Sequence, residues 1–356
     1  PIPFFKRKQQ KKNCIAKRKP MNYPIRLLRR KPAVLFVGSM LILYSSMTLA
    51  CHKGPASAVR ADTTVVNPTN PPVITRSVPA TDTIFGNGVD LQPSYYNGGN
   101  VMFGFALMLA SPKIKSVRIE IEPTVPIALA ASWIQQAHNN GYKVIATYHK
   151  YTVLGSDNAA DLTDAANWWK ANYTTLAAAG SFTVNLMNEW GDHNLSAASY
   201  ASAYNNAIAI VRQVYSGPII LDCPGWGQET SVAADAVKGT GGSGATIADT
   251  NIILSAHIYP NGYNQAKGHT FQQADLDDLA SAGRPCIVGE FGNSPSGSAD
   301  WSGMVTYAKS KKWAVLGWSW NGDGGPMNMV TPAWDSVTNA STYGQSSYFS
   351  VIYNLL

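Results

Sequence analysis

Short apolar runs alternate with longer helical segments along most of the chain after residue 84. Most of these runs are continuously apolar rather than alternating in polarity, which is typical of strands that are buried on both faces of a sheet. We expect strands at residues 88–92, 116–121, 143–148, 182–187, 218–222, 251–256, 286–290 and 313–318. We expect helices between them at residues 126–140, 161–179, 197–215, 271–282 and 299–311.

Glycines stand between several predicted helices and the strands that follow, at Gly141, Gly180, Gly217 and Gly283. Glycine is favoured at the end of a helix because it adopts the left-handed backbone conformation at low cost. Strand–helix alternation repeated eight times predicts a (β/α)8 TIM barrel that forms one catalytic domain over residues 84–356. A doubly wound open sheet is the alternative, but no G-x-G-x-x-G motif follows the first strand.

The N-terminal region differs in composition from the predicted barrel. Residues 1–20 are basic, of low complexity and without Met, so we expect them to be upstream sequence rather than native protein. We expect an export signal over residues 21–50, in which basic residues precede an apolar run. Cys51 follows a small residue, as in bacterial lipoprotein signals, and we expect it to be lipidated. A single membrane anchor and a secretory signal that leaves Cys51 unmodified are the alternatives.

Residues 51–83 contain many Pro, Thr, Val, Ala and Ser residues and have no periodic apolar face. This composition predicts a semi-extended tether between the anchor and the barrel. We therefore expect an exported protein that is lipid-anchored at the bacterial cell envelope or secreted. Its contact with a membrane would be limited to the lipid anchor or the signal.

The formal net charge of +7 comes from the N-terminal region. Residues 1–50 hold 12 of the 28 Lys and Arg residues and none of the 21 Asp and Glu residues. Residues 51–356 therefore have 16 basic and 21 acidic side chains, a net charge of −5. Because a nucleic-acid-binding domain needs a basic patch on its folded part, we expect no nucleic-acid partner. A basic nucleic-acid-binding tail at residues 1–20 is the competing interpretation.

The four cysteines show no C-x-x-C spacing, which argues against a zinc site of that kind. Cys223 and Cys286 fall at opposite ends of their predicted strands, so we expect both to be reduced and buried. A metal held by His149 and His257 would need a third ligand, and no H-x-H or H-x-x-x-H spacing supplies one. We expect no metal and no cofactor.

Polar and aromatic residues gather at the C-terminal ends of the predicted strands, where a (β/α)8 barrel builds its active site. They are Arg118, His149, Asn188, Glu189, Trp190, Trp226, His257, Tyr259, Glu290, Trp318 and Trp320. Two carboxyl groups that flank one bond are the minimal apparatus of glycoside hydrolysis. Glu189 and Glu290 follow the fourth and seventh strands, so they can face each other across the barrel. A separation of about 5 Å would predict retention of configuration.

The neighbouring residues would give the two carboxyl groups different protonation states. We expect Arg118 and Tyr259 to keep Glu290 ionised, and negative charge with partial burial to raise the pKa of Glu189. Asn188 could hydrogen-bond the sugar 2-hydroxyl. Tryptophans offer flat apolar faces for sugar rings. Core packing or structural pairing is the alternative for each supporting residue, and Trp190, Trp226 and Trp320 fit a core position as well as a site position.

Three motifs stand at the ends of predicted strands four, six and seven: Asn188-Glu189, His257-Ile-Tyr259 and Gly289-Glu290-Phe291-Gly292. Together they resemble glycoside hydrolase family 5 of clan A. The stretches at 188–190, 222–228 and 316–322 resemble its bacterial endo-β-1,4-mannanase branch, subfamily 8. This resemblance covers about residues 88–322 and implies that Glu189 is the acid/base and Glu290 the nucleophile. It implies a supporting shell of Arg118, His149, Asn188, His257, Tyr259 and Trp318.

The resemblance implies endo-hydrolysis of β-1,4-mannosidic linkages in mannan, glucomannan or galactomannan by a monomer. An endo-β-1,4-glucanase with the same carboxyl pair is the alternative. A non-hydrolytic carbohydrate-binding barrel is an alternative of another class, which the presence of both carboxyl groups disfavours. Lys150 stands where the family usually has an acidic residue, and Asn321 where it often has Lys. These differences leave the polysaccharide more open than the reaction.

Overall fold

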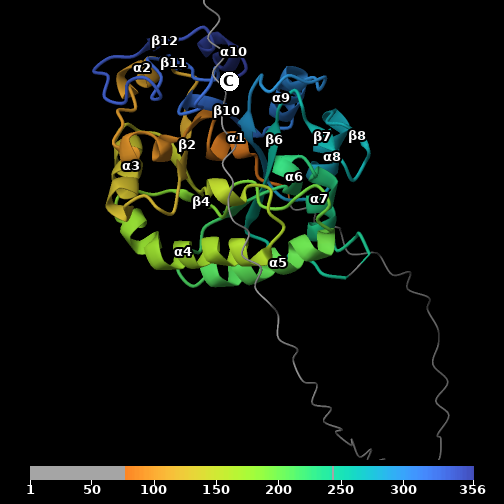
Figure 1. Cartoon of the computed structure of the whole chain (residues 1–356). Coiled ribbons are helices and arrows are strands. Elements are labelled where there is room, and N and C mark those ends of the chain that lie inside the picture. The colour runs from red at the N-terminus through yellow and green to blue at the C-terminus, as the bar shows by residue number, and fades with distance from the viewer. Residues whose placement is uncertain (1–76, 243) are drawn as a thin grey trace, which may run out of the picture. The chain divides into compact units, whose positions relative to one another are not determined.

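Eight parallel strands close into a barrel in the order β1-β10-β9-β6-β5-β4-β3-β2 (Figure 1). They are β1 Gly88–Leu91, β2 Ser116–Ile121, β3 Lys143–Tyr148, β4 Thr183–Asn185, β5 Ile219–Asp222, β6 Ile252–Ile258, β9 Cys286–Phe291 and β10 Ala314–Asn321. The predicted (β/α)8 barrel is confirmed. The open sheet is wrong, because β1 pairs with β2 on one side and with β10 on the other.

The computed structural model describes residues 77–242 and 244–356. The expected upstream sequence, the export signal, Cys51 and most of the tether lie outside these residues. Within the described part of the chain, no helix has the length and apolar character needed to cross a membrane.

The five predicted helices are present around the strands (Figure 1). They are α3 Ile127–Asn139, α4 Ala159–Ala177, α5 Ala197–Val211, α8 Gln273–Ala280 and α9 Trp301–Ser310. Side chains cap the N-termini of α4, α5 and α9: Asn158 accepts the Ala160 N–H, Ser196 the Ser199 N–H and Asp300 the Gly303 N–H. Further helices are α1 Thr81–Ile84, α2 Phe105–Leu109, α6 Pro224–Gly227, α7 Thr230–Lys238 and α10 Phe349–Tyr353.

The remaining elements lie in the connections. Three 3₁₀ turns occur at η1 Pro93–Tyr95, η2 Asn97–Gly99 and η3 Tyr151–Val153. Two short antiparallel pairs join β7 Tyr263–Asn264 to β8 His269–Thr270 and β11 Val330–Thr331 to β12 Gly344–Gln345. The β7–β8 pair lies between β6 and α8, so it extends the connection that follows β6.

Two of the four expected glycine helix ends are left-handed: Gly141 has a φ of 82° and Gly283 a φ of 63°. Gly217 does not play this role, because α5 already ends at Val211 and the backbone of Gly217 is outside the left-handed region. Cys223 and Cys286 are free and buried, as predicted.

Candidate active site

Inside the barrel, side chains change from apolar to polar toward the C-terminal ends of the strands. An apolar cluster is formed by Phe85, Ile145, Ile220, Ile253, Ile287, Ala314 and Leu316. Successive residues on one face of a strand are two positions apart, so Asp222 follows Ile220 and Ser255 follows Ile253 on the inner face. A buried polar layer therefore lies above the apolar cluster, and the candidate site is built on it.

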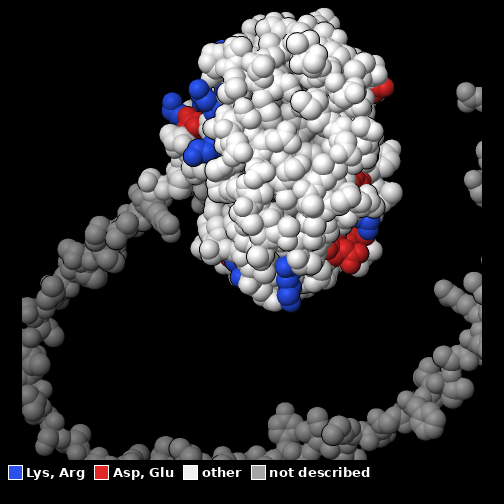
Figure 2. All heavy atoms as spheres, turned by 90° about the vertical axis from the view of Figure 1, so that its left-hand side faces the viewer, with Lys and Arg blue, Asp and Glu red and all other residues white. Residues whose placement is uncertain are grey.

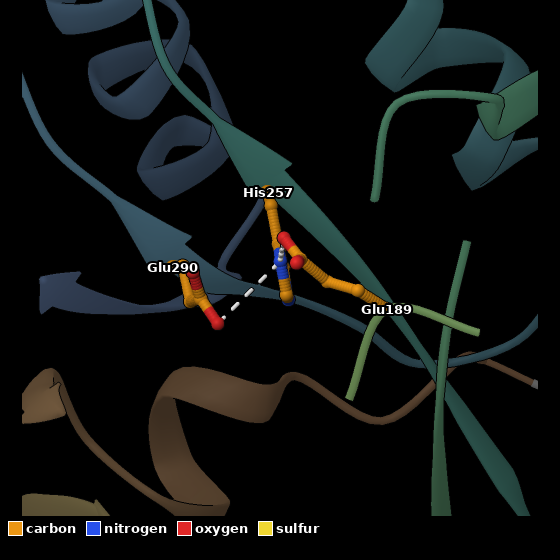
Figure 3. A group of neighbouring side chains, drawn as sticks. All are labelled: Glu189, His257 and Glu290. Atoms are coloured by element: carbon orange, nitrogen blue, oxygen red, sulfur yellow. Dashed lines mark hydrogen bonds and ion pairs between the residues drawn. The ribbon is translucent and has the colours of Figure 1, made fainter. Parts of the chain in front are cut away.

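Glu189, His257 and Glu290 meet above this layer (Figure 3). One carboxylate oxygen of each glutamate and a ring nitrogen of His257 all lie within 4.8 Å of one another. Glu290 belongs to β9 and His257 to β6, whereas Glu189 lies in the turn after β4. The chain thus brings together the two carboxyl groups that the sequence predicted to face each other.

The backbone of Glu189 has an unusual conformation, with a φ of 49° in the left-handed region that few non-glycine residues adopt. Its N–H donates to Asp222 Oδ2 at 3.1 Å, and its carbonyl accepts the Gly155 N–H at 2.8 Å. Gly155 is itself left-handed, and a Cβ there would lie 2.3 Å from the Trp226 ring. Hydrogen bonds on both sides therefore fix the turn that carries Glu189.

Glu290 is surrounded by donors. Arg118 Nη1 donates to Oε1 at 2.9 Å, and the Tyr259 hydroxyl donates to Oε2 at 2.8 Å. Burial alone would raise the pKa of Glu290, but the positive charges of His257 and Arg118 and the Tyr259 hydrogen bond lower it below its usual range. These contacts agree with the expectation that Arg118 and Tyr259 keep this carboxyl group ionised, and His257 acts in the same direction.

The pKa of Glu189 is shifted in the opposite direction. Burial and the negative charge of Glu290 raise its pKa, although the hydrogen bond with His257 opposes this shift. The ring nitrogen Nδ1 of His257 lies 3.0 Å from Glu189 Oε1. Glu189 therefore holds a proton under conditions in which Glu290 has lost its own, as general acid and nucleophile require.

His257 is completely buried between the two glutamates. Burial lowers its pKa, but the charges of Glu290 and Asp222 raise it well above its usual value. Glycines make room for the ring: a Cβ on Gly227 would lie 2.6 Å from His257 Cβ, and one on Gly289 would lie 3.0 Å from Nε2.

A metal could in principle be bound by carboxylate and imidazole groups at this spacing. The described residues contain one group of three side chains close enough to share a metal ion: Glu189, His257 and Glu290. His149 does not belong to this group. The expected absence of a metal stays a prediction.

The sequence interpretation missed two buried acidic residues beside Arg118. Arg118 Nη1 contacts Glu120 Oε1 at 2.8 Å and Asp90 Oδ1 at 3.1 Å. Burial raises the pKa of Asp90 well above its usual value, and its Oδ2 has no hydrogen-bond partner among the residues that the structure describes. The available signal was an acidic residue inside a buried strand, since Asp90 lies in β1 and Glu120 in β2.

Two cavities of about 470 Å³ each meet at Glu189 and Tyr259, which line both. The first is also lined by Gln92, Tyr95, Tyr96, His149, Tyr151, Leu154, Asn188, Glu290, Trp318 and Asp323. The second is also lined by His193, Trp226, Gln228, Asn261, Tyr263, Ser294, Pro295 and Met327. Glu189 therefore lies at the junction of two hollows, and Glu290 lines the first of them.

Each cavity has one of the predicted tryptophans in its wall. Trp318 lines the first, and its Nε1 donates to Asp323 at 2.7 Å. Trp226 lines the second, is 39% exposed, and its ring lies 5.3 Å from that of His193. Both indoles are thus placed where a sugar ring could stack on them.

The predictions for Trp190 and Trp320 as substrate-binding residues are wrong. Both side chains are completely buried. Trp190 donates to the Asn158 carbonyl at 3.1 Å and packs among the tyrosines of α5, and Trp320 donates to the Phe103 carbonyl at 2.7 Å. Their indole N–H groups are satisfied inside the protein core, so neither ring reaches a cavity.

His149 and Asn188 line the first cavity, and in the described part of the chain neither side chain is hydrogen-bonded to the two carboxyl groups. Arg118 Nη2 donates to the Asn188 side-chain oxygen, and His149 Nδ1 lies 2.7 Å from the Tyr95 hydroxyl. Burial lowers the pKa of His149 to about 4. Tyr95 belongs to a polar stretch after the first strand, residues 92–96, whose position at a barrel strand end could have revealed it.

Two residues that differ from the mannanase pattern lie outside the cavities. Lys150 Nζ is 3.9 Å from Asp161 Oδ1 at the start of α4. Asn321 is buried, and its side-chain oxygen accepts the N–H groups of Gly322 and Trp334. Asn321 thus holds the loop after β10 instead of facing a ligand.

Figure 2 shows one face of the described part of the chain. Charged side chains are few there and lie mainly toward its edges, so this face has no basic patch.

The family model for "Cellulase (glycosyl hydrolase family 5)" matches residues 120–324, which is more than half of the chain. This range includes both carboxyl groups and their supporting residues from Glu120 to Asp323. The chain belongs to glycoside hydrolase family 5. The family explains why a (β/α)8 barrel presents two glutamates at the ends of its fourth and seventh barrel strands.

Two proteins are similar in sequence to this family 5 chain. "Beta-mannanase/endoglucanase A" of Caldicellulosiruptor saccharolyticus is 29% identical over 62% of the chain and 16% of that protein. "Mannan endo-1,4-beta-mannosidase" of Cellvibrio japonicus is 25% identical over 64% of the chain and 52% of that protein. The match therefore spans about half of the second relative and a small part of the first.

A solved structure of the same fold is the catalytic domain of a mannanase from Streptomyces sp. SirexAA-E. It has a TM-score of 0.59 and 22% sequence identity, and the match covers 76% of this chain and 85% of that one. This likeness concerns the fold, and it agrees with the closed barrel described above.

Proposed function

We propose that this family 5 protein is an endo-acting glycoside hydrolase that cleaves β-1,4-mannosidic linkages with retention of configuration. Glu290 attacks the anomeric carbon while Glu189 protonates the leaving oxygen. Glu189 then removes a proton from the water that releases the sugar.

The separation of the two carboxyl groups is the observation that carries this proposal. Retaining enzymes have carboxyl groups about 5 to 5.5 Å apart, whereas inverting enzymes leave about 6.5 to 9.5 Å for a water molecule. One carboxylate oxygen of Glu189 and one of Glu290 lie within 4.8 Å of each other. Their pKa values also differ in the direction that an acid and a nucleophile need.

The two cavities support cleavage inside a polymer. A chain that crosses the site would place sugars in the first cavity on one side of Glu189 and in the second cavity on the other. Trp318 and Trp226 would each offer a ring to these sugars. One relative is named as a beta-mannanase and the other as a mannan endo-1,4-beta-mannosidase, which supports mannan as the substrate.

Purified protein incubated with galactomannan, carboxymethylcellulose and xylan tests this assignment. We expect new reducing ends from galactomannan with a rapid fall in viscosity, as internal cleavage requires. Proton NMR during hydrolysis of mannohexaose should show the β-anomer of the new reducing end first. Absence of hydrolysis in the whole panel, with polymer binding retained, would favour the non-hydrolytic barrel.

An endo-β-1,4-glucanase is the second candidate. One relative carries both activities in its name, and the matching family model is described as cellulase. Faster release of reducing ends from carboxymethylcellulose than from galactomannan would select this candidate. The roles of Glu189 and Glu290 would be the same for either polymer.

We further propose that the protein is exported and lipid-anchored through Cys51 at the bacterial cell envelope, and that the catalytic domain acts as a monomer. The basic and apolar segments before Cys51 support this proposal. Labelling with a radioactive fatty acid should mark the wild-type protein and not the Cys51→Ser variant. Equal labelling of both would contradict the anchor, and light scattering of the purified domain tests the monomer.

A further inference from the structure

Asp222 lies at the end of β5, completely buried beneath the catalytic pair. Its Oδ2 accepts the Glu189 backbone N–H at 3.1 Å and lies 3.5 Å from His257 Nε2. The other ring nitrogen of His257, Nδ1, lies 3.0 Å from Glu189 Oε1. Asp222 therefore reaches Glu189 by two routes, one through the backbone and one through the imidazole ring.

We propose that Asp222 is a positioning residue for the acid/base, because it keeps His257 charged and anchors the turn that carries Glu189. This inference rests on the proposed role of Glu189 as proton donor. It goes beyond that role by naming the group that orients the donor.

The charge of a buried imidazolium needs a fixed counter-ion, since burial removes its hydration. His257 Nε2 has no hydrogen-bond partner in the described residues. The carboxylate of Asp222, whose Oδ2 lies 3.5 Å from Nε2, stabilises the positive charge of the ring. Burial opposes both charges, yet the carboxylates raise the pKa of His257 and His257 lowers the pKa of Asp222 to about 2. The pair therefore stays ionic.

An ionic pair fixes the direction of the hydrogen bond to Glu189. Imidazolium donates through both ring nitrogens, so Nδ1–H donates to Glu189 Oε1 and the acid proton resides on Oε2. In the first step, the Oε2–H bond breaks as an O–H bond forms on the glycosidic oxygen. The C1–O bond breaks, its electron pair goes to that oxygen, and Glu290 forms the new bond to C1. The carboxylate left on Glu189 then lies beside the imidazolium.

Asp222 is itself held in place. Asn185 Nδ2 donates to its Oδ1 at 3.2 Å, and Arg118 Nη2 lies 3.6 Å from its Oδ2. The hydrogen bond that Asp222 accepts from Glu189 stabilises a φ of 49°, which costs free energy in a residue with a Cβ. An uncharged side chain at position 222 would weaken this bond as well as the pair with His257.

The Asp222→Asn variant keeps the size of the side chain and removes its charge. We compare kcat/KM for phenyl and 2,4-dinitrophenyl β-mannobioside, because phenol needs protonation to leave and dinitrophenolate does not. The expected loss is about 10-fold to 100-fold on the phenyl substrate, as for a lost hydrogen bond to a charged group. On the dinitrophenyl substrate, the expected loss is less than about threefold.

Asp90→Asn is the matched control, since Asp90 is equally buried and contacts Arg118 at 3.1 Å. It should change both rates by the same factor and leave their ratio at the wild-type value. Equal losses on both substrates for Asp222→Asn would overturn the inference and assign Asp222 a purely structural role.

A second variant covers the case in which Asp222→Asn fails to fold. His257→Gln removes the charge that Asp222 holds, and it must show the same selective loss on the phenyl substrate; equal losses would overturn the inference. Failure of the proposed function looks different, because the wild-type protein would then release neither phenol. If the wild-type protein cleaves only the phenyl and 2,4-dinitrophenyl β-cellobiosides, the substrate assignment changes from mannan to glucan. The variants are then compared on these two cellobiosides.

Discussion

Glu189 and Glu290 bring carboxylate oxygens within 4.8 Å of each other, yet their pKa values move in opposite directions. The cause is the unequal placement of positive charge and hydrogen-bond donors. His257 lies near both carboxyl groups, 3.0 Å from Glu189 Oε1 and 3.6 Å from Glu290 Oε1, whereas Arg118 and Tyr259 both donate to Glu290. Ionised Glu290 then discourages ionisation of Glu189, so each carboxyl group helps to set the protonation state of the other.

Substitution of Glu189 and substitution of Glu290 should impair different steps of the reaction. Glu189→Gln cannot donate a proton, so hydrolysis of mannan should slow by about 10²-fold to 10⁴-fold. Azide should accelerate the Glu189→Ala variant on 2,4-dinitrophenyl β-mannobioside and yield a β-mannosyl azide, whereas Glu290→Ala should yield the α-azide. The products are identified by NMR, and identical anomers from both variants would contradict the assigned roles.

The pH dependence of kcat/KM should be bell-shaped. Activity requires ionised Glu290, whose pKa is lowered, so the acid limb should lie below the usual range for glutamate. It also requires protonated Glu189, whose pKa is raised, so the alkaline limb should lie above that range.

Tyr259→Phe removes the hydrogen bond to Glu290 Oε2 and should move the acid limb to higher pH while the alkaline limb stays in place. The matched control is Tyr307→Phe on α9, whose hydroxyl donates to Asp277 on α8. An acid limb that does not move in Tyr259→Phe would show that this hydrogen bond does not set the Glu290 pKa.

Two tryptophans of the same strand should respond differently to replacement. Trp320→Ala removes a completely buried ring and should lower the free energy of unfolding by about 3–5 kcal/mol. Trp318→Ala removes a cavity wall and should mainly lower kcat/KM on mannan. Urea denaturation and initial rates measure the two effects, and a large loss of stability in Trp318→Ala would place its ring in the core.

Trp226→Ala should weaken binding of long substrates with little effect on stability, because the ring is partly exposed in the second cavity. Calorimetric titration of mannohexaose into a Glu290→Ala background should show a loss of about tenfold, equal to about 1.4 kcal/mol. The single Glu290→Ala variant is the reference. Equal affinity in the two proteins would mean that sugar does not stack on Trp226.

The sequence was sufficient for the barrel and for the two glutamates. Continuous apolar runs mark the buried strands, and the carboxyl groups follow from the rule that barrel active sites lie at the strand ends. The direction of individual side chains beyond the strands was harder to predict. Trp190 follows Glu189 in a turn with a left-handed residue, and that conformation turns its ring toward α5.

The prediction that Trp320 binds substrate was wrong for a related reason. It is two positions after Trp318, which would place both rings on one face of a regular strand. The pairing of β10 with β1 shifts register, since Val89 is opposite Gly317 and Leu91 is opposite Asn321. This irregularity has no clear signature in the apolar pattern, and it lets the two rings diverge. Asp90 and Glu120 were missed because they lie within predicted strands, whereas most site residues were expected at the strand ends.

Gly155 couples two loops that are far apart in sequence. Its missing side chain leaves the space that the Trp226 indole fills, while its N–H is bound to the carbonyl of Glu189. Relatives with a larger residue at position 155 should therefore have a smaller one at position 226, and the two sites should change together during evolution. An engineer who transplants either loop from another enzyme would have to transplant both.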